Sequence, residues 1–230
     1  GAAAATAIAS ALGAAGMLAA AWTLPRARAR GVHDLAALWR SETLRGALGL
    51  VRFGAVPALA SGLELAGFSI LIALSTQQGD VVTHAFQIVF SIHNLTFSLA
   101  LGMGSAAGVR AGNAVGEGVP GQAGWRTSIA AALSAISIGA LAVLLFVFPG
   151  PVVGLFPATE PVRALAARML PVWAPFILFD GVQVVFVYAL RSLGDQVVAG
   201  LNSILAFFVI TGGAGLLLVA WGLGRFALVY

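Results

Sequence analysis

The sequence predicts an all-α, polytopic membrane protein with about six transmembrane helices. Hydrophobic residues make up 60% of its 230 residues, charged residues make up only 9%, and the mean hydropathy is +1.00. A soluble domain carries about 25% charged residues. The chain also contains six apolar stretches of 22 residues or more. Each can cross a bilayer, because about 20 apolar residues in a helix are enough to do so.

The first apolar stretch, residues 1–24, is rich in alanine, and such small side chains suit close packing between membrane helices. It has no basic region at its start and is longer than the apolar core of a secretory signal. We therefore expect a transmembrane helix and a chain that continues a longer protein. Residues 25–46 form a basic linker, in which HDLAALWR (33–40) has the spacing of an amphipathic helix on the membrane surface.

Residues 47–230 hold the other five stretches, which we place at 53–74, 81–109, 127–148, 169–190 and 197–221. The glycine-rich segment 111–126, AGNAVGEGVPGQAGWR, is predicted to be a loop. It lacks the lysine and the preceding strand of a phosphate-binding loop, so a nucleotide site is not expected. Pro149 and Pro151 are expected to end the helix before them.

Two carboxylates interrupt these apolar stretches. Glu64 and Asp180 are each the twelfth residue of a 22-residue stretch, so each lies near the middle of its span. An acid at that depth costs roughly 2.5–3.5 kcal/mol on insertion scales, and it has to face protein or a water-filled cavity. Pro171 and Pro175 precede Asp180 and predict a kink or local unwinding of its helix. We therefore predict that both acids are functional.

The arginines indicate which loops face the cytoplasm. If the linker after the first helix is inside, nine of the twelve arginines fall on the cytoplasmic side: Arg26, Arg28, Arg30, Arg40, Arg45, Arg52, Arg110, Arg126 and Arg191. Arg163, Arg168 and Arg225 fall outside. This asymmetry follows the positive-inside rule and fixes the direction of each helix. The helices of Glu64 and Asp180 then run in opposite directions, which brings the two acids to one depth.

Several other functions find no support in the sequence. The formal net charge is +4, but the arginines are spread over helix ends and do not form a basic face with aromatic residues. Nucleic acid is therefore not expected as a partner. The chain has no cysteine, which excludes disulfides and thiol chemistry. No Ser-His-Asp, metal-ligand or nucleotide signature is present, so we predict neither an enzyme nor a metal site.

The chain resembles the multidrug and toxic compound extrusion (MATE) transporters over nearly its whole length, and four segments carry the resemblance. Residues 1–24 look like the sixth helix of that family, and GLVRFGAVPALASGLELAGFSI, with a proline ahead of Glu64, looks like the seventh. The eighth helix and its loop resemble VVTHAFQIVFSIHNLTFSLALGMGSAAGVRAGNAVGEG, with Gln87, Gly102, Arg110, Gly112 and Gly116 in register. The tenth resembles FDGVQVVFVYALRSLGDQ, which carries Asp180, Gln183, Arg191 and Asp195.

The resemblance implies the C-terminal lobe of a twelve-helix, two-lobed transporter. Residues 1–24 would be the last helix of the N-terminal lobe, and 47–230 a C-terminal lobe whose final helix is missing or only begun. Such a protein is an antiporter of the bacterial plasma (inner) membrane, which exports cationic or amphiphilic drugs in exchange for protons or sodium ions. Its partners would be the bilayer, the organic cation and the N-terminal lobe, with no further cofactor. Glu64 and Asp180 would carry the coupling cation.

One departure from the family pattern bears on the coupling ion. Phe176, four residues before Asp180, replaces a tyrosine found in some sodium-binding members and so lacks its hydroxyl. We therefore expect coupling to protons rather than to a sodium ion at Glu64 and Asp180. Two further departures are Ser192, where glycine is usual, and Tyr188, where a small residue is usual.

The residues predicted to line the cavity with the two acids are Gln183, Phe176, Gln87, Asn94 and Phe68. A structural role is the alternative for each. The acids could be held by hydrogen bonds from Ser61, Gln87, Gln183 or backbone groups freed by the prolines. His93 and Asn94 could form an interhelical hydrogen bond, and phenylalanines such as Phe179 and Phe186 could simply face lipid.

Two other functions stay open at this stage. A lipid-linked oligosaccharide flippase of the same superfamily would share the helix count, but its cavity should carry arginines at membrane depth, and none lies in the middle of a predicted span. A membrane scaffold without transport activity becomes the better hypothesis if the natural chain is half-length, because one lobe cannot enclose a central cleft.

Overall fold

The computed structural model describes residues 2–25, 31, 36 and 40–221. Outside the described residues lie Leu35, Leu38 and Trp39, which define the predicted surface helix, together with Arg26, Arg28, Arg30 and Arg225. The chain forms two compact units, residues 1–53 and residues 54–230. Every predicted site residue belongs to the second unit.

The first unit contains α1 (Ala2–Thr23) and the start of α2 (Ser41–Gln77). α1 has the bounds expected of the first apolar stretch, and its side chains are exposed from residue 3 to the end of the helix. The helix is apolar on every side and carries no acidic or basic residue. A helix of this kind is suited to lipid or to the interior of a larger bundle.

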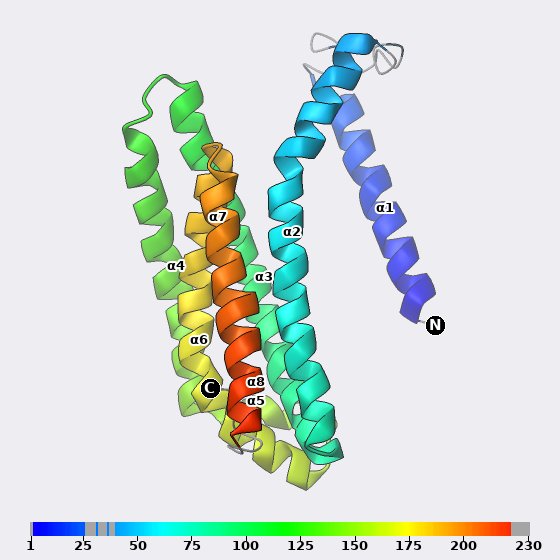
Figure 1. The fold of residues 1–230 in the computed structure, drawn as a ribbon, viewed down its shortest axis with the longest axis vertical. Coiled ribbons are helices and arrows are strands. Elements are labelled where there is room, and N and C mark those ends of the chain that lie inside the picture. Colours follow the sequence, from blue (N-terminus) through cyan, green and yellow to red (C-terminus); the bar gives the residue numbers. More distant parts are fainter. Residues whose placement is uncertain (1, 26–30, 32–35, 37–39, 222–230) are drawn as a thin grey trace. The chain divides into compact units, whose positions relative to one another are not determined.

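The second unit continues with the elements drawn in Figure 1: α3 (Asp80–Gly116), α4 (Gln122–Val147), α5 (Pro149–Gly154), α6 (Glu160–Ser192), α7 (Gln196–Ser203), a π-helix η2 (Ile204–Gly212) and α8 (Gly213–Ala220). The last three follow one another as a single membrane span. With α1 and α2, the described residues contain six helices long and apolar enough to cross a membrane, and no strand. The predicted all-α, six-span membrane protein is confirmed.

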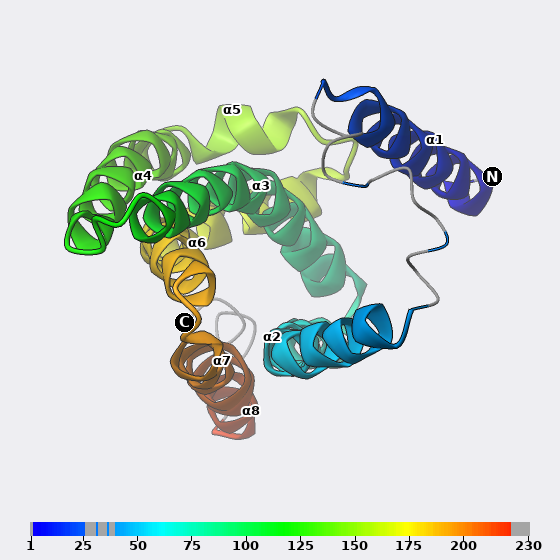
Figure 2. The ribbon, with the colours of Figure 1, turned by 90° about the horizontal axis from the view of Figure 1, so that it is seen from above.

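Helices α3, α4 and α6 pack against one another, and α7 lies beside α6 (Figure 2). Small residues allow the backbones to approach closely. A Cβ added to Gly108 would lie 3.0 Å from the carbonyl oxygen of Tyr188, and Gly181 is covered directly by Ile138. Ser134 of α4 also donates a hydrogen bond of 3.0 Å to the carbonyl oxygen of Gly181. These contacts fix the backbone of α6 next to Asp180.

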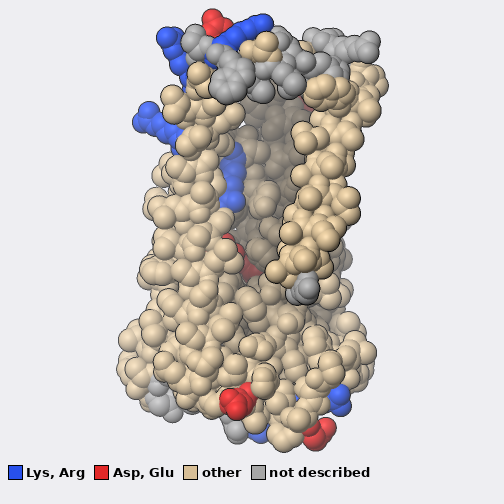
Figure 3. All heavy atoms as spheres, turned by 90° about the vertical axis from the view of Figure 1, so that its right-hand side faces the viewer, with Lys and Arg blue, Asp and Glu red and all other residues tan. Residues whose placement is uncertain are grey.

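The second unit has an apolar core and an apolar outer surface. The largest fully buried side chains are those of Phe86, Ile138, Met169, Leu170, Val89, Val153, Val185, Ser75 and Ser134. Outside the core, α2, α3, α4, α6 and the last span all expose large hydrophobic side chains. On the face drawn in Figure 3, nearly all side chains between the two ends of the helices are uncharged. Such a surface contacts lipid at lower free-energy cost than water.

The predicted loop at 111–126 is wrong in extent. α3 continues to Gly116 and α4 begins at Gln122, so only residues 117–121 form the turn. Ala111, Ala114 and Ala123 are buried together with Ala189 of α6, and this packing of small side chains extends both helices. Gly118 adopts φ of 78° in the remaining turn, where a residue without Cβ is favoured.

The prolines affect the two helices differently. α4 ends at Val147, two residues before Pro149, as predicted. Pro149 then starts the short helix α5, because the first turn of a helix needs no N–H donor at that position. α6 runs through Pro171 and Pro175 without the expected unwinding. These two prolines are four residues apart and therefore lie on one side of the helix, so the backbone groups that they leave unpaired are confined to that side.

The π-helix in the last span was not predicted. Within η2, Thr211 Oγ1 donates a hydrogen bond of 2.9 Å to the carbonyl oxygen of Ala206, five residues earlier. η2 also passes close to α2, since a Cβ added to Gly67 would lie 2.5 Å from the carbonyl oxygen of Phe207. Such π segments are rare and occur frequently at functional sites. Phe207 does contribute to the pocket that contains Glu64.

Candidate functional site

A pocket of about 220 Å³ lies between α2, α3, α6, α7 and η2. Its polar residues are Ser61, Glu64, Gln183, Tyr188, Arg191 and Ser203, and its apolar residues are Leu65, Phe97, Leu101, Val184, Val187 and Phe207. Glu64 is half-buried in this pocket. Residues from five elements therefore place one carboxylate and one guanidinium against a largely apolar wall.

Asp180 lies behind the wall of this pocket, one turn of α6 before the pocket residue Val184. It is only 4% exposed. Its Oδ2 lies 4.0 Å from Nε2 of His93 on α3, and its Oδ1 has no hydrogen-bond partner among the described residues. Asp180 and Glu64 lie close enough for their charges to interact.

Five aromatic side chains contact the His93 ring, with centroid distances of 5.4–5.9 Å: Phe68, Phe90, Phe97, Trp173 and Phe176. They leave His93 only 3% exposed. Phe97 also lines the Glu64 pocket, so this one ring separates the pocket from His93. The predicted lining residues Phe68 and Phe176 thus belong to an aromatic cluster around His93 and not to the wall of the pocket.

Arg191 brings a guanidinium to the pocket that was not predicted there. The residue lies in the last turn of α6, as expected, and its side chain lines the same pocket as Glu64. Its guanidinium carbon lies 5.8 Å from the ring centroid of Tyr188, and its charge interacts with that of Glu64. A long arginine side chain in the last turn can reach several ångströms along the helix. Its Nε is buried and has no hydrogen-bond partner among the described residues.

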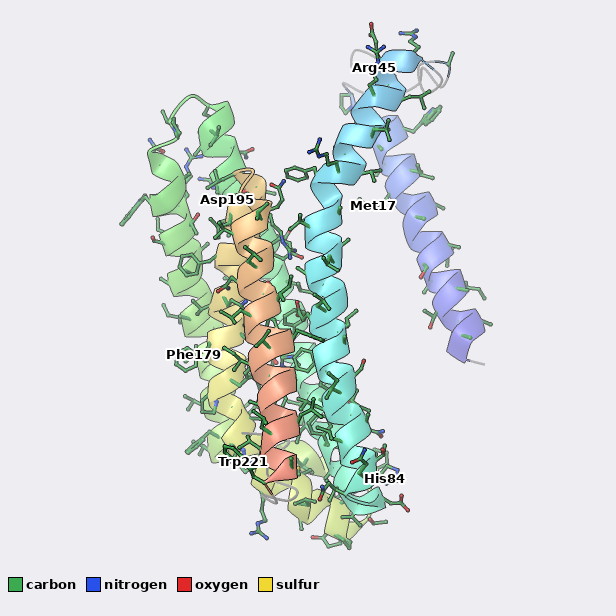
Figure 4. The ribbon with its side chains drawn as sticks, viewed as in Figure 1. Met17, Arg45, His84, Phe179, Asp195 and Trp221 are labelled. Atoms are coloured by element: carbon green, nitrogen blue, oxygen red, sulfur yellow. The ribbon has the colours of Figure 1, made fainter. Side chains whose placement is uncertain are left out.

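The other predicted lining residues divide into two groups. Gln183 lines the Glu64 pocket as expected. Gln87 and Asn94 do not, since both are exposed. Gln87 belongs to a separate pocket of about 420 Å³ together with His84, at the end of the bundle opposite to Asp195 (Figure 4). Neither residue therefore lines the pocket of Glu64, whereas His93, one position before Asn94, faces Asp180 of α6.

The structure also places Phe179, Phe186 and the pair His93 and Asn94, for which the sequence left a structural role open. Phe179 and Phe186 are 72% and 45% exposed, so they face lipid as the alternative interpretation held. The interhelical hydrogen bond expected from the pair His93 and Asn94 is not made by His93, whose Nε2 lies 4.0 Å from Oδ2 of Asp180 and whose Nδ1 has no partner among the described residues, while Asn94 is exposed. The sequence did contain a signal for His93. It is a titratable residue inside an apolar stretch, the same criterion that identified both acids.

The geometry permits proton or cation exchange. A carboxylate without hydrogen-bond partners in a low-dielectric environment is stable when a proton or another cation neutralises it. Asp180 is such a group, and Glu64 is its charged neighbour with access to the pocket. Among the described residues, no group of three or more His, Cys, Asp and Glu side chains could hold a metal ion. Any metal cation at this site would depend on Asp180 and Glu64 alone for charge.

Comparison with known proteins adds a family assignment. Residues 58–212 match the sequence model of a family described as MatE. The chain is 31% identical over 229 residues to a probable multidrug resistance protein NorM of Brucella suis, and 33% identical over 199 residues to one of Deinococcus radiodurans. These alignments cover 90% and 84% of this chain, but 48% and 43% of the relatives. The chain thus spans about half the length of the curated relatives it matches.

Proposed function

The chain belongs to the MATE family of multi-pass membrane proteins, and we propose that it forms part of a cation-coupled exporter of cationic or amphiphilic compounds and is not an enzyme. The observation that supports this most directly is the position of Glu64 in an apolar pocket within electrostatic range of the buried Asp180. An organic cation with an apolar body matches both features of the pocket. The relatives named as multidrug resistance proteins are consistent with such a ligand.

Competition for the carboxylates would couple export of the organic cation to entry of protons. A carboxylate inside the membrane can be neutralised by an organic cation or by a proton, and binding of one disfavours binding of the other. If protonation and drug binding also favour different conformations of the protein, entry of protons drives release of the drug on the other side. Glu64, which faces the pocket, would meet the drug, and Asp180 would retain the proton behind it.

We further propose that the exporter needs a second lobe. The pocket of about 220 Å³ is smaller than typical small-molecule sites, which measure about 300–1,000 Å³. α1 is apolar and exposed on all sides, and small residues make up most of it. An N-terminal lobe of the same protein would enlarge the pocket and pack against α1. The proposed location is the plasma membrane of a bacterium, in line with the bacterial relatives.

The coupling ion and the activity can be measured in one experiment. The protein at its natural full length would be reconstituted in vesicles and efflux of ethidium followed under a pH gradient or a sodium gradient. We expect efflux under the pH gradient alone, because Phe176 offers no hydroxyl and hard cations need several oxygen ligands. Sodium-driven efflux after collapse of the pH gradient would contradict proton coupling. Absence of efflux under both gradients would contradict the exporter itself.

The flippase remains the second candidate, because Arg191 does place a guanidinium in the pocket. An anionic head group could bind to such a cation. However, the carboxyl group of Glu64 lines the same pocket and, when ionised, offsets the charge of Arg191. The same vesicles distinguish the two functions, since translocation of a lipid-linked oligosaccharide without ethidium efflux would favour the flippase.

The direction of the helices gives a separate prediction. The chain has no cysteine, so single cysteines can be introduced at Val119, in the turn between α3 and α4, and at Thr159, before α6; both positions are exposed. The arginine distribution predicts that Val119→Cys reacts with a membrane-impermeant maleimide from the cytoplasm and Thr159→Cys from outside. The reverse labelling pattern would overturn the proposed orientation of all six helices.

A further inference from the structure

The buried partner of Asp180 is an imidazole. Nε2 of His93 lies 4.0 Å from Oδ2 of Asp180, and the two side chains are 3% and 2% exposed. This distance is too long for a hydrogen bond but short for an electrostatic contact. The far nitrogen, Nδ1 of His93, and the far oxygen, Oδ1 of Asp180, have no hydrogen-bond partner among the described residues. The described residues thus offer these two far atoms no hydrogen bond, and the contact between Nε2 and Oδ2 is the ion-pair contact of the two groups.

The surroundings of this pair favour a proton over a metal cation. A sodium ion is a hard cation and is bound by several oxygen atoms at once. On the His93 side of the pair, the five rings that contact the imidazole are hydrocarbon or indole and supply no oxygen. A proton needs only one nitrogen or oxygen atom, and the pair offers both.

We propose that His93 is the residue that selects protons over sodium ions at Asp180. Its imidazole occupies the side of the carboxylate where a metal ion would need oxygen ligands, and it supplies a second site for the proton. His93 acts through Asp180 and does not touch the pocket, so it is a positioning and selectivity residue. This inference rests on the proposed cation-coupled function and concerns a residue that the family resemblance does not single out.

Few other charged groups act on the pair. From α6, Asp180 itself faces His93, and Arg191 and Tyr188 lie two to three turns further along the pocket wall. From α2 the charged group is Glu64, which interacts with both Asp180 and Arg191. η2 contains no titratable residue, and the single charged residue of α4, Arg126, is paired with Glu117 at the end of the bundle. Besides the His93 contact, Glu64 is therefore the charged group that acts on Asp180.

The decisive variant is His93→Asn, which replaces the imidazole with a smaller side chain that has an oxygen and no titratable group. In vesicles with the full-length protein, we expect pH-driven ethidium efflux to fall about tenfold, the size of effect typical for a residue that orients a functional group. We also expect sodium to stimulate efflux in this variant but not in the wild type. Asn94→Ala is the matched control, because Asn94 is the next residue of α3 and is exposed.

A second measurement does not depend on transport. The infrared band of the protonated carboxyl group that disappears in Asp180→Asn reports the proton on Asp180 and can be followed as a function of pH. We expect sodium to leave the midpoint of this titration unchanged in the wild type and in Asn94→Ala. In His93→Asn the midpoint should shift and become dependent on sodium. If His93 had a purely structural role, neither the midpoint of the Asp180 titration nor its dependence on sodium would change.

The outcomes separate the two proposals. If wild type and Asn94→Ala export no ethidium, the proposed function fails, while the infrared titration still decides the role of His93. If His93→Asn keeps the wild-type midpoint and gains no sodium dependence, the selectivity role is wrong even when efflux is normal. Should His93→Asn fail to fold, a sodium-dependent midpoint in the wild type would by itself overturn the inference.

Discussion

Asp180→Asn is expected to leave the protein folded and inserted but to reduce ion-coupled efflux roughly 100-fold, the usual scale for losing a proton-transferring group. The amide keeps the shape of the carboxyl group and cannot titrate. Oδ1 of Asp180 has no hydrogen-bond partner among the described residues and the His93 contact is long, so the substitution breaks no short bond. Removing a carboxylate from the middle of the membrane eases insertion by up to about 3 kcal/mol.

Glu64→Gln is expected to act in the same way, and the double variant should lose little more than either single one. The two carboxylates interact electrostatically, and residues that act as one unit have non-additive effects. Ethidium efflux and proton flux would be measured in vesicles for the wild type, both single variants and the double variant. Wild-type coupling in Asp180→Asn, or strictly additive losses, would leave the acids with structural roles only.

Glu117→Gln provides the matched control for removal of a carboxylate. Glu117 follows α3 at the end of the bundle and accepts a hydrogen bond of 2.7 Å from Nη2 of Arg126. This hydrogen bond holds the pKa of Glu117 below its usual range, so the exposed carboxylate is charged at neutral pH. Glu117→Gln removes a negative charge from the surface but does not touch the Glu64 pocket. Normal coupling in this variant is the expected result.

Gly67→Ala is expected to destabilise the protein and to impair efflux, although the change adds a single methyl group. The new Cβ would lie 2.5 Å from the carbonyl oxygen of Phe207, and a backbone oxygen cannot rotate away as a side chain can. Overpacking of this kind costs about 1–3 kcal/mol. Phe207 lines the Glu64 pocket, so displacement of η2 would also change the shape of the pocket.

The control for this variant lies on the same helix. Gly62 of α2 has no atom within 4 Å of an added Cβ, so Gly62→Ala should be neutral or stabilising by up to about 1 kcal/mol. Thermal unfolding of both variants in detergent would compare them, with a shift of about 2–4 °C expected for each kcal/mol. Equal unfolding temperatures for the two variants would show that the backbone of Phe207 in η2 does not pack against Gly67 of α2.

Composition and periodicity were enough to predict the helices but not their ends. Long apolar stretches can satisfy their backbone groups in lipid only as helices, so the six spans follow from hydropathy. The extension of α3 and α4 into 111–126 depends on Ala111, Ala114 and Ala123 meeting Ala189, and contacts between distant segments are not visible in local sequence. For the same reason, glycine-rich composition favoured a loop where close helix packing was the better explanation.

Parts of the site were predictable because charge inside an apolar stretch is costly and therefore conspicuous. Glu64 and Asp180 were identified in this way and Gln183 through the family resemblance, whereas Gln87 and Asn94 do not line the Glu64 pocket. One sequence does not reveal which side of a nearly uniformly apolar helix faces its neighbours. The reach of Arg191 into the pocket and its contact with Tyr188 likewise depend on a side-chain conformation, which the residue type alone does not determine.

The π-helix η2 has a consequence for how this chain is compared with its relatives. Each i→i+5 hydrogen bond encloses one more residue than the i→i+4 bond of an α-helix, so residues 204–212 use additional chain to cover the same rise. A relative with a regular α-helix at this position needs fewer residues between the counterparts of Ser203 and Gly213. An alignment gap within 204–212 would then mark a change of helix type. The residue of the relative that occupies the place of Phe207 would be fewer than four positions after the counterpart of Ser203.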